Sequence, residues 1–183
     1  MRKLLLIPLL FCSMAFSQEF ILTANNYVNN TDESKNYIVV EYPDLSQKEL
    51  FDKTKTFIHT KFQNLKGDGL NEVQFSHLKL RSKSPGAYIK MFGSKNLTDY
   101  INITYDISFK DGKVMIKAIF EDFEANDIAG EKTYLTGGNS WSGKSIFNKN
   151  GKIWLKEYFD DANNKANQFL QELKAYLSNK EDW

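Results

Sequence analysis

Cysteine is nearly absent from this chain of 183 residues: Cys12 is the only one, and it lies close to the N-terminus. If residues 1–17 are removed, as argued below, no cysteine remains. A chain without cysteine has no disulfide, no thiol nucleophile and no thiolate ligands for a metal. Packing and hydrogen bonds must therefore hold the fold together.

An excess of charge of either sign is also lacking. The 24 basic and 23 acidic residues give a net charge of +1, and the loss of Arg2 and Lys3 would leave −1. No basic block stands out along the chain. Because nucleic-acid-binding domains carry a basic patch that neutralises phosphates, the composition gives no reason to expect a nucleic-acid partner.

Only the N-terminus has the charge and apolar pattern of a targeting segment. Met1 to Lys3 is positively charged, Leu4 to Phe11 is apolar, and Ala15 to Ser17 has the small-x-small pattern of a cleavage site. This order predicts a signal peptide, residues 1–17, that is cleaved between Ser17 and Gln18. A buried N-terminal helix is the alternative interpretation.

Export has two further consequences. The apolar run is too short to remain as a membrane span, so we expect no transmembrane anchor after cleavage. A lipoprotein signal needs a small residue before its cysteine, and bulky Phe11 precedes Cys12, which argues against lipidation. We therefore expect a protein of the periplasm or cell surface, or a secreted one.

The remaining length suits a single domain. Residues 18–36 are mostly polar after Phe20-Ile21-Leu22, and we expect them to form a flexible leader. Residues 37–179 are predicted to form one α+β domain.

Two helices are predicted from apolar spacing. Ser46 and Glu49 form a capping box before a helical stripe that runs to Leu65, and Gly67 to Gly69 end this helix. A second amphipathic helix is expected from Ile153 to Ser178.

The strands are predicted from β-branched runs and turns. Tyr37 to Tyr42 forms the first, and Ser84 to Gly86 is expected to be a turn between strands at 73–82 and 87–92. The clearest hairpin has Asp111-Gly112 as its turn, where both residues are expected to need a positive φ. Its register pairs apolar residues with one another throughout: Phe109 with Val114, Ile107 with Ile116, Tyr105 with Ala118, and Ile103 with Phe120.

The predicted order is therefore β-α-β-β-β-β-α, with a glycine-rich segment at 123–151 before the last helix. We expect an antiparallel sheet of about five strands with both helices packed on one face.

One stretch matches a phosphate-binding motif. Gly138 to Ser145 fits the P-loop pattern Gly-x-x-x-x-Gly-Lys-Ser. A P-loop needs a buried strand before it and a helix that begins at the lysine. Here the preceding strand is short and half polar, and Asn150-Gly151 interrupt any helix that begins at Lys144. We interpret the stretch as a Gly/Ser-rich loop without nucleotide binding.

Other candidate chemistry is sparse. His59 and His77 lack partners at ligand spacing, and Glu121 and Asp122 should point to opposite faces of their strand. We therefore predict no catalytic residue, metal ligand or cofactor. Trp141 lies among glycines and serines, where it either packs onto the core or offers a stacking platform. Trp141 and Lys144 are the candidate ligand-binding residues.

The layout resembles a family of exported bacterial proteins, described as a domain of unknown function with a TBP-like fold. The resemblance covers residues 37–123, and its signals are the strand at 37–42, the capped helix and the Lys-Asp-Gly-Lys hairpin. It implies the fold and export but no functional residues.

Two functions stay open. A non-catalytic binding or structural module of the bacterial envelope is favoured, with an envelope protein or small ligand bound at the uncovered sheet face or near Trp141. An exported hydrolase with its site in 123–151 is the alternative.

Overall fold

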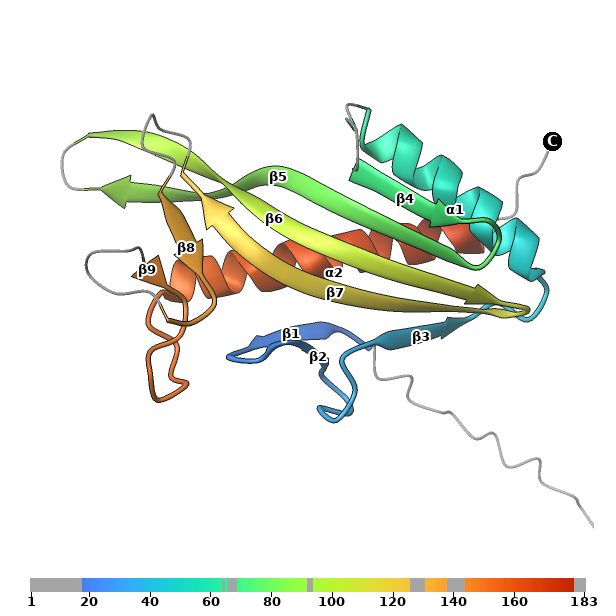
Figure 1. Cartoon of the computed structure of the whole chain (residues 1–183), viewed down its shortest axis with the longest axis horizontal. Helices are drawn as coiled ribbons and strands as arrows, with labels where there is room; N and C mark the ends of the chain where they lie inside the picture. Colours follow the sequence, from blue (N-terminus) through green and yellow to red (C-terminus); the bar gives the residue numbers. More distant parts are fainter. Residues whose placement is uncertain are drawn as a thin grey trace, which may run out of the picture.

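The structure is a computed structural model that describes residues 18–63, 65, 69–91, 94–125, 131–137 and 144–179, with only the backbone at 87–91 and 94–98. A two-stranded sheet, a seven-stranded sheet and two helices make up this part of the chain (Figure 1). The elements are β1 (Phe20–Thr23), β2 (Asn26–Asn29), β3 (Ile38–Glu41), α1 (Gln47–Lys61), β4 (Leu70–Val73), β5 (His77–Met91), β6 (Ser94–Lys110), β7 (Lys113–Glu124), β8 (Lys132–Tyr134), β9 (Lys144–Ser145) and α2 (Lys156–Ser178).

The main sheet has more strands than predicted, and their order along the chain differs. It contains seven strands in the described residues, in the order β4-β5-β6-β7-β8-β9, with β3 paired to β7 as well. The strands β4, β8 and β9 are four residues long or shorter, so they carry too few alternating positions for a periodic signal. All pairings are antiparallel except that of β8 with β9.

The central hairpin β6–β7 has the predicted register. Phe109 faces Val114, Ile107 faces Ile116, Tyr105 faces Ala118 and Ile103 faces Phe120. The prediction for its turn is wrong in one detail. Gly112 has a positive φ, +72°, as expected, but Asp111 does not. Asp111 instead accepts a hydrogen bond from the backbone N–H of Gln47 at 2.8 Å and so caps α1.

Both helices cover the same face of the sheet, as predicted. The capping box of Ser46 and Glu49 is present at the start of α1. Phe51 of α1 packs edge-on against Phe109, and Phe169 of α2 stacks on Tyr105 with ring centroids 3.9 Å apart. Positions 105 and 109 share a face of β6 because side chains alternate along a strand. No helix of the described residues lies on the other face of the sheet.

The second predicted hairpin is wrong. Ser84 to Gly86 do not form a turn, because β5 runs from His77 to Met91 and pairs along its length with β6. Proline and glycine are tolerated here because the register shifts between Pro85 and Tyr88. A Cβ on Gly86 would lie 3.1 Å from the Asp99 carbonyl oxygen, so this glycine permits the close approach of the strands.

The expected flexible leader is also wrong, since residues 18–36 contain the β1–β2 hairpin, which packs on the domain. Phe20, Leu22 and Tyr27 are buried in the core. Asn167 of α2 exchanges two hydrogen bonds with the Phe20 backbone, and Asn163 accepts one from Leu22 N–H at 2.7 Å. The polar composition of residues 18–36 suggested a flexible segment. The backbone of β1 is instead held by the asparagine side chains of α2, which take the place of a neighbouring strand.

The β1–β2 hairpin also completes one edge of β7. β3 pairs with β7 at 113–116, and β8 pairs with it at 123–124. Between them, Asn26 donates through Nδ2 to the Phe120 carbonyl at 2.9 Å and accepts at Oδ1 from the Phe120 N–H at 2.8 Å. The backbone groups along this edge of β7 therefore find hydrogen-bond partners in three separate segments: β3, Asn26 of the β1–β2 hairpin, and β8.

Candidate functional site

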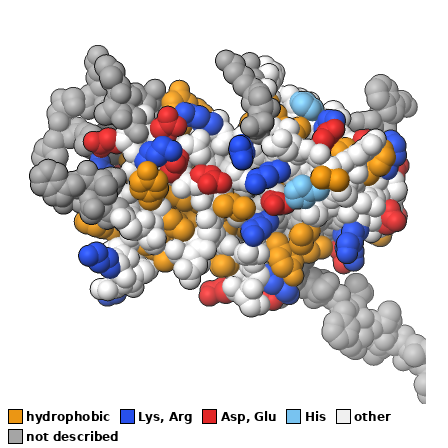
Figure 2. Space-filling model, viewed as in Figure 1, with side chains coloured by type: hydrophobic (Ala, Val, Ile, Leu, Met, Phe, Trp, Pro, Cys, Tyr) orange, Lys and Arg blue, Asp and Glu red, His pale blue; other side chains and the backbone are white. Residues whose placement is uncertain are grey.

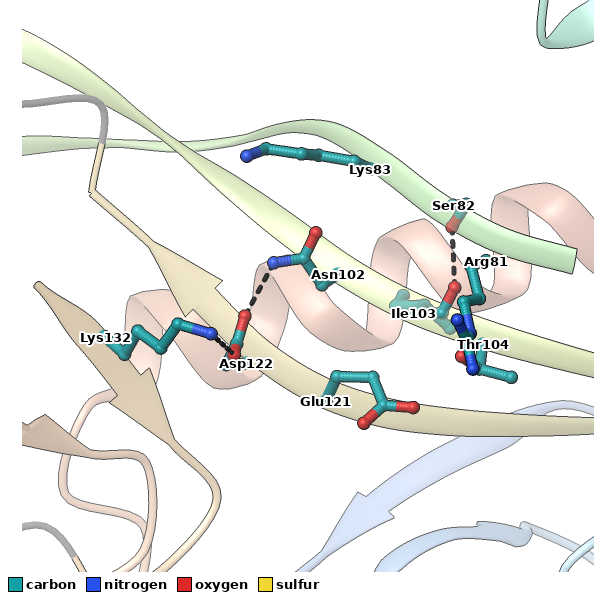
Figure 3. A pocket seen from close by; sticks show the side chains of 9 residues that line it. All are labelled: Arg81, Ser82, Lys83, Asn102, Ile103, Thr104, Glu121, Asp122 and Lys132. Carbon is teal, nitrogen blue, oxygen red and sulfur yellow. Dashed lines mark hydrogen bonds and ion pairs between the residues drawn. The ribbon is translucent and has the colours of Figure 1, made fainter. Parts of the chain in front are cut away.

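The uncovered face of the sheet is polar and faces the viewer in Figure 2, where basic and acidic side chains mix over β5 to β7. Side chains from β5, β6, β7 and β8 line a hollow of about 370 Å³ on it (Figure 3). We call this hollow the open-face pocket; its lining residues are Arg81, Ser82, Lys83, Asn102, Ile103, Thr104, Glu121, Asp122 and Lys132. Its volume lies in the range of small-molecule sites, about 300–1,000 Å³.

A β-bulge in β7 shapes the pocket. Asn102 faces Asp122 while the next residue, Ile103, faces Phe120, so Glu121 has no partner of its own across the ladder. Such a bulge re-aims neighbouring side chains. Glu121 and Asp122 consequently both line the pocket, which corrects the expectation that these adjacent carboxylates point to opposite faces.

Asp122 is the buried centre of one side of the pocket, with a side chain only 10% exposed. Asn102 donates to it at 2.6 Å, and Lys132 pairs with it at 2.7 Å. This hydrogen bond raises the pKa of the Lys132 ammonium. At the rim, Lys83 pairs with Glu124 at 2.7 Å and lowers the pKa of that carboxyl group. These four charged groups neutralise one another in pairs.

Arg81 and Glu121 differ from this network, because neither has an ion-pair partner among the described residues. Arg81 lies opposite Thr104 across the β5–β6 ladder, and the two side chains lie beside each other in Figure 3. Glu121 extends separately from β7. The pocket thus offers one planar cation with several donors and one carboxylate acceptor.

Among the described residues that line the pocket, no nucleophile is paired with a base. Its one serine, Ser82, donates its hydroxyl proton to the Ile103 carbonyl at 2.9 Å and is buried. Nowhere in the described part of the chain do three or more histidine, cysteine or acidic side chains gather as metal ligands.

A larger hollow of about 560 Å³ lies beside the start of α1, but its side chains already have a structural role. Glu49 accepts from the Ser46 backbone, and Asp111 accepts from Gln47. Groups that cap a helix are not free to bind a ligand without loss of stability. The open-face pocket is therefore the stronger candidate.

The residues predicted from sequence lie elsewhere. Trp141 and Ser17 are outside the described residues, and Gln18 lies just before β1. Lys144 is exposed and begins β9, where it pairs in parallel with Thr133. No helix starts at Lys144, so the geometry of a P-loop lysine is not formed. His77 pairs with Asp106 at 3.1 Å, and His59 is exposed on α1.

The comparisons with known proteins concern the fold. No family model and no curated protein matches the sequence. The structure is similar to a crystal structure of a DUF4468 family protein from Bacteroides ovatus, with a TM-score of 0.60 and 12% identity over 80% of this chain and 87% of that one. It is also similar to a TBP-like protein from Parabacteroides distasonis, with a TM-score of 0.57 and 14% identity over 79% and 92% of the two chains.

This likeness supports the α+β, TBP-like fold expected from the resemblance and carries no site residue. Within the described residues, no helix is long and apolar enough to cross a membrane.

Proposed function

We propose that this protein is an exported, non-catalytic binding module of the bacterial envelope that holds a small ligand in the open-face pocket. The observation that carries the proposal is Arg81, a guanidinium without an ion-pair partner among the described residues, in a hollow of about 370 Å³. An arginine presents a planar set of donors that matches a carboxylate or phosphate in two hydrogen bonds.

The rest of the pocket narrows the ligand class. Glu121 accepts hydrogen bonds from an ammonium or hydroxyl group, and Asp122 is already satisfied by Asn102 and Lys132. The ligand that fits both free charges is a small zwitterion: a carboxylate for Arg81 and an ammonium group for Glu121. Amino acids and short peptides have this chemistry.

The hydrolase alternative gains no support from the described residues of 123–151. Lys132 is paired with Asp122, and the Ser145 hydroxyl donates to the Phe147 carbonyl at 3.0 Å. Neither group is arranged as a base or a nucleophile.

Calorimetry tests the binding proposal, with amino acids and dipeptides as ligands and neutral sugars as the comparison. Arg81→Gln should weaken binding roughly 10–100-fold, since a hydrogen bond to a charged group contributes about 1.5–3 kcal/mol. Lys79→Gln is the matched control, because it removes a cation from the same strand outside the pocket. Equal affinity in Arg81→Gln and the unmodified protein, or no binding by any zwitterion, would refute the proposal.

Export has its own test. N-terminal sequencing of the protein recovered from cells should find Gln18 as the first residue. A protein that begins at Met1, or at a lipidated Cys12, contradicts the expected signal peptide.

A further inference from the structure

Exposed hydrophobic side chains gather at one end of the molecule. Six large hydrophobic side chains are exposed among the described residues, and three of them belong to this end. They are Tyr134 at 40% exposure, Ile153 at 46% and Trp154 at 67%. A tryptophan at this exposure leaves most of its apolar surface in water, so it contributes little to the packing of the core.

Backbone contacts bring these three residues together. Ile146 donates to the Tyr134 carbonyl at 2.9 Å, and Trp154 donates to the Ile146 carbonyl at 2.7 Å. Phe147 pairs with Ile153 in an antiparallel bridge. The segment from Lys144 to Lys156 together with Tyr134 is called the lysine–tryptophan tip below.

The tip is held in a fixed shape. Asn148 accepts at its side-chain oxygen from the backbone N–H groups of Asn150 and Lys152, which closes the turn. Gly151 has a φ of +72°, as this turn requires. Phe147 is buried and packs edge-on against Phe159 of α2, with ring centroids 5.9 Å apart. Figure 1 shows the loop after β9, in orange, projecting beyond the sheet.

The tip is also basic. Lysine occupies positions 144, 149, 152 and 156 with no acidic residue between them. Lys156 pairs with Asp160, whereas Lys144, Lys149 and Lys152 are exposed and have no ion-pair partner among the described residues. Glu157, the next residue along, is the nearest acidic side chain in sequence.

We propose that the lysine–tryptophan tip binds the surface of a membrane that contains anionic phospholipids. Tryptophan and tyrosine are typical of the membrane–water interface, where an apolar ring and a polar group are both satisfied. Lysines close to a membrane are attracted by anionic headgroups. A projecting tip suits a flat, deformable surface, whereas a protein partner would need a matching groove. The tip shares no residue with the open-face pocket, and it would hold the exported protein at a membrane without a transmembrane helix.

Vesicle co-sedimentation tests the proposal with the mature protein recovered from cells. The protein should bind vesicles of phosphatidylcholine with phosphatidylglycerol more tightly than vesicles of phosphatidylcholine alone. Each lysine should contribute about fivefold in affinity, so the double variant Lys149→Glu/Lys152→Glu should lose at least about tenfold. Trp154→Ala should weaken binding to both kinds of vesicle.

Two control variants separate the tip from general charge and hydrophobicity. Lys79→Glu/Lys117→Glu changes the net charge by the same amount on the open face, and Val73→Ala trims a side chain that is 61% exposed on β4. Both controls should bind as the unmodified protein does, and circular dichroism should show all variants folded.

Three results would overturn the proposal. They are no binding to anionic vesicles, an equal loss in the tip and control variants, and self-association in solution that Trp154→Ala abolishes without any lipid binding. The last result would assign the tip to a second copy of this chain.

Discussion

Replacing Asn26 by alanine should destabilise the protein because its side chain takes the place of a neighbouring strand. Its amide exchanges two hydrogen bonds with the Phe120 backbone, at 2.9 and 2.8 Å. Each bond contributes about 1 kcal/mol net, and more where a buried backbone group is left without a partner. The loss of both should lower the free energy of unfolding by about 2–3 kcal/mol.

The backbone at Asn26 adds a second contribution. Its φ is +89°, a conformation that asparagine tolerates better than alanine does. Alanine should therefore cost about 1 kcal/mol beyond the lost hydrogen bonds. Glycine loses the same bonds but adopts this φ freely, so Asn26→Gly should be about 1 kcal/mol more stable than Asn26→Ala, after allowance for its more flexible unfolded chain.

Urea unfolding of the two variants measures both effects. Asn25→Ala is the matched control, since Asn25 is exposed and adjacent, and its substitution should change stability by less than about 0.5 kcal/mol. The reasoning fails if Asn26→Ala is no more destabilising than Asn25→Ala. A glycine variant less stable than the alanine variant would refute the backbone argument alone.

Three further predictions concern single side chains. Tyr158→Phe should lower the free energy of unfolding by about 2 kcal/mol, because it removes the 2.8 Å hydrogen bond to buried Asp99; a change under about 0.5 kcal/mol in urea unfolding would contradict this. Lys83→Ala should raise the pKa of Glu124 toward its usual 4.5 in an NMR titration. Because this pKa is lowered in the folded state, the pair stabilises the fold above the usual value, by less than about 1 kcal/mol, and this is lost as the pH falls through the lowered pKa. An unchanged pKa in the variant would refute the pairing. Calorimetry with ATP and magnesium should be flat for both the unmodified protein and Lys144→Ala, because Lys144 begins a strand; binding that the variant loses would overturn this.

Sequence patterns predicted the elements whose signals are local. The β6–β7 hairpin could be placed in register because only one pairing matches apolar residues with one another. The start of α1 could be placed because its capping box lies within four residues. The β1–β2 hairpin could not, because the partners of its backbone, Asn163 and Asn167, lie in the last helix.

The open-face pocket could not be predicted from the sequence either, because it too depends on residues that are distant along the chain. Its residues come from four strands, and the signal available was the polar alternation at Asn102 and Thr104 in β6. The position of Glu121 depends on a bulge, which shifts the alternation by one residue and leaves no mark in composition. Simple alternation placed Glu121 and Asp122 on opposite faces, and only the pairing of β6 with β7 reveals otherwise.

If the protein is exported as we propose, the contact between β1 and α2 sets the order in which the domain can fold. The hydrogen bonds of Phe20 and Leu22 span 147 and 141 residues of chain, and their partners lie in α2. A chain that crosses a membrane from its N-terminus delivers β1 first and α2 last. β1 could then reach its partners Asn163 and Asn167 only after α2 has been delivered. In that case the docking of α2 on β1 would be the step that completes the domain.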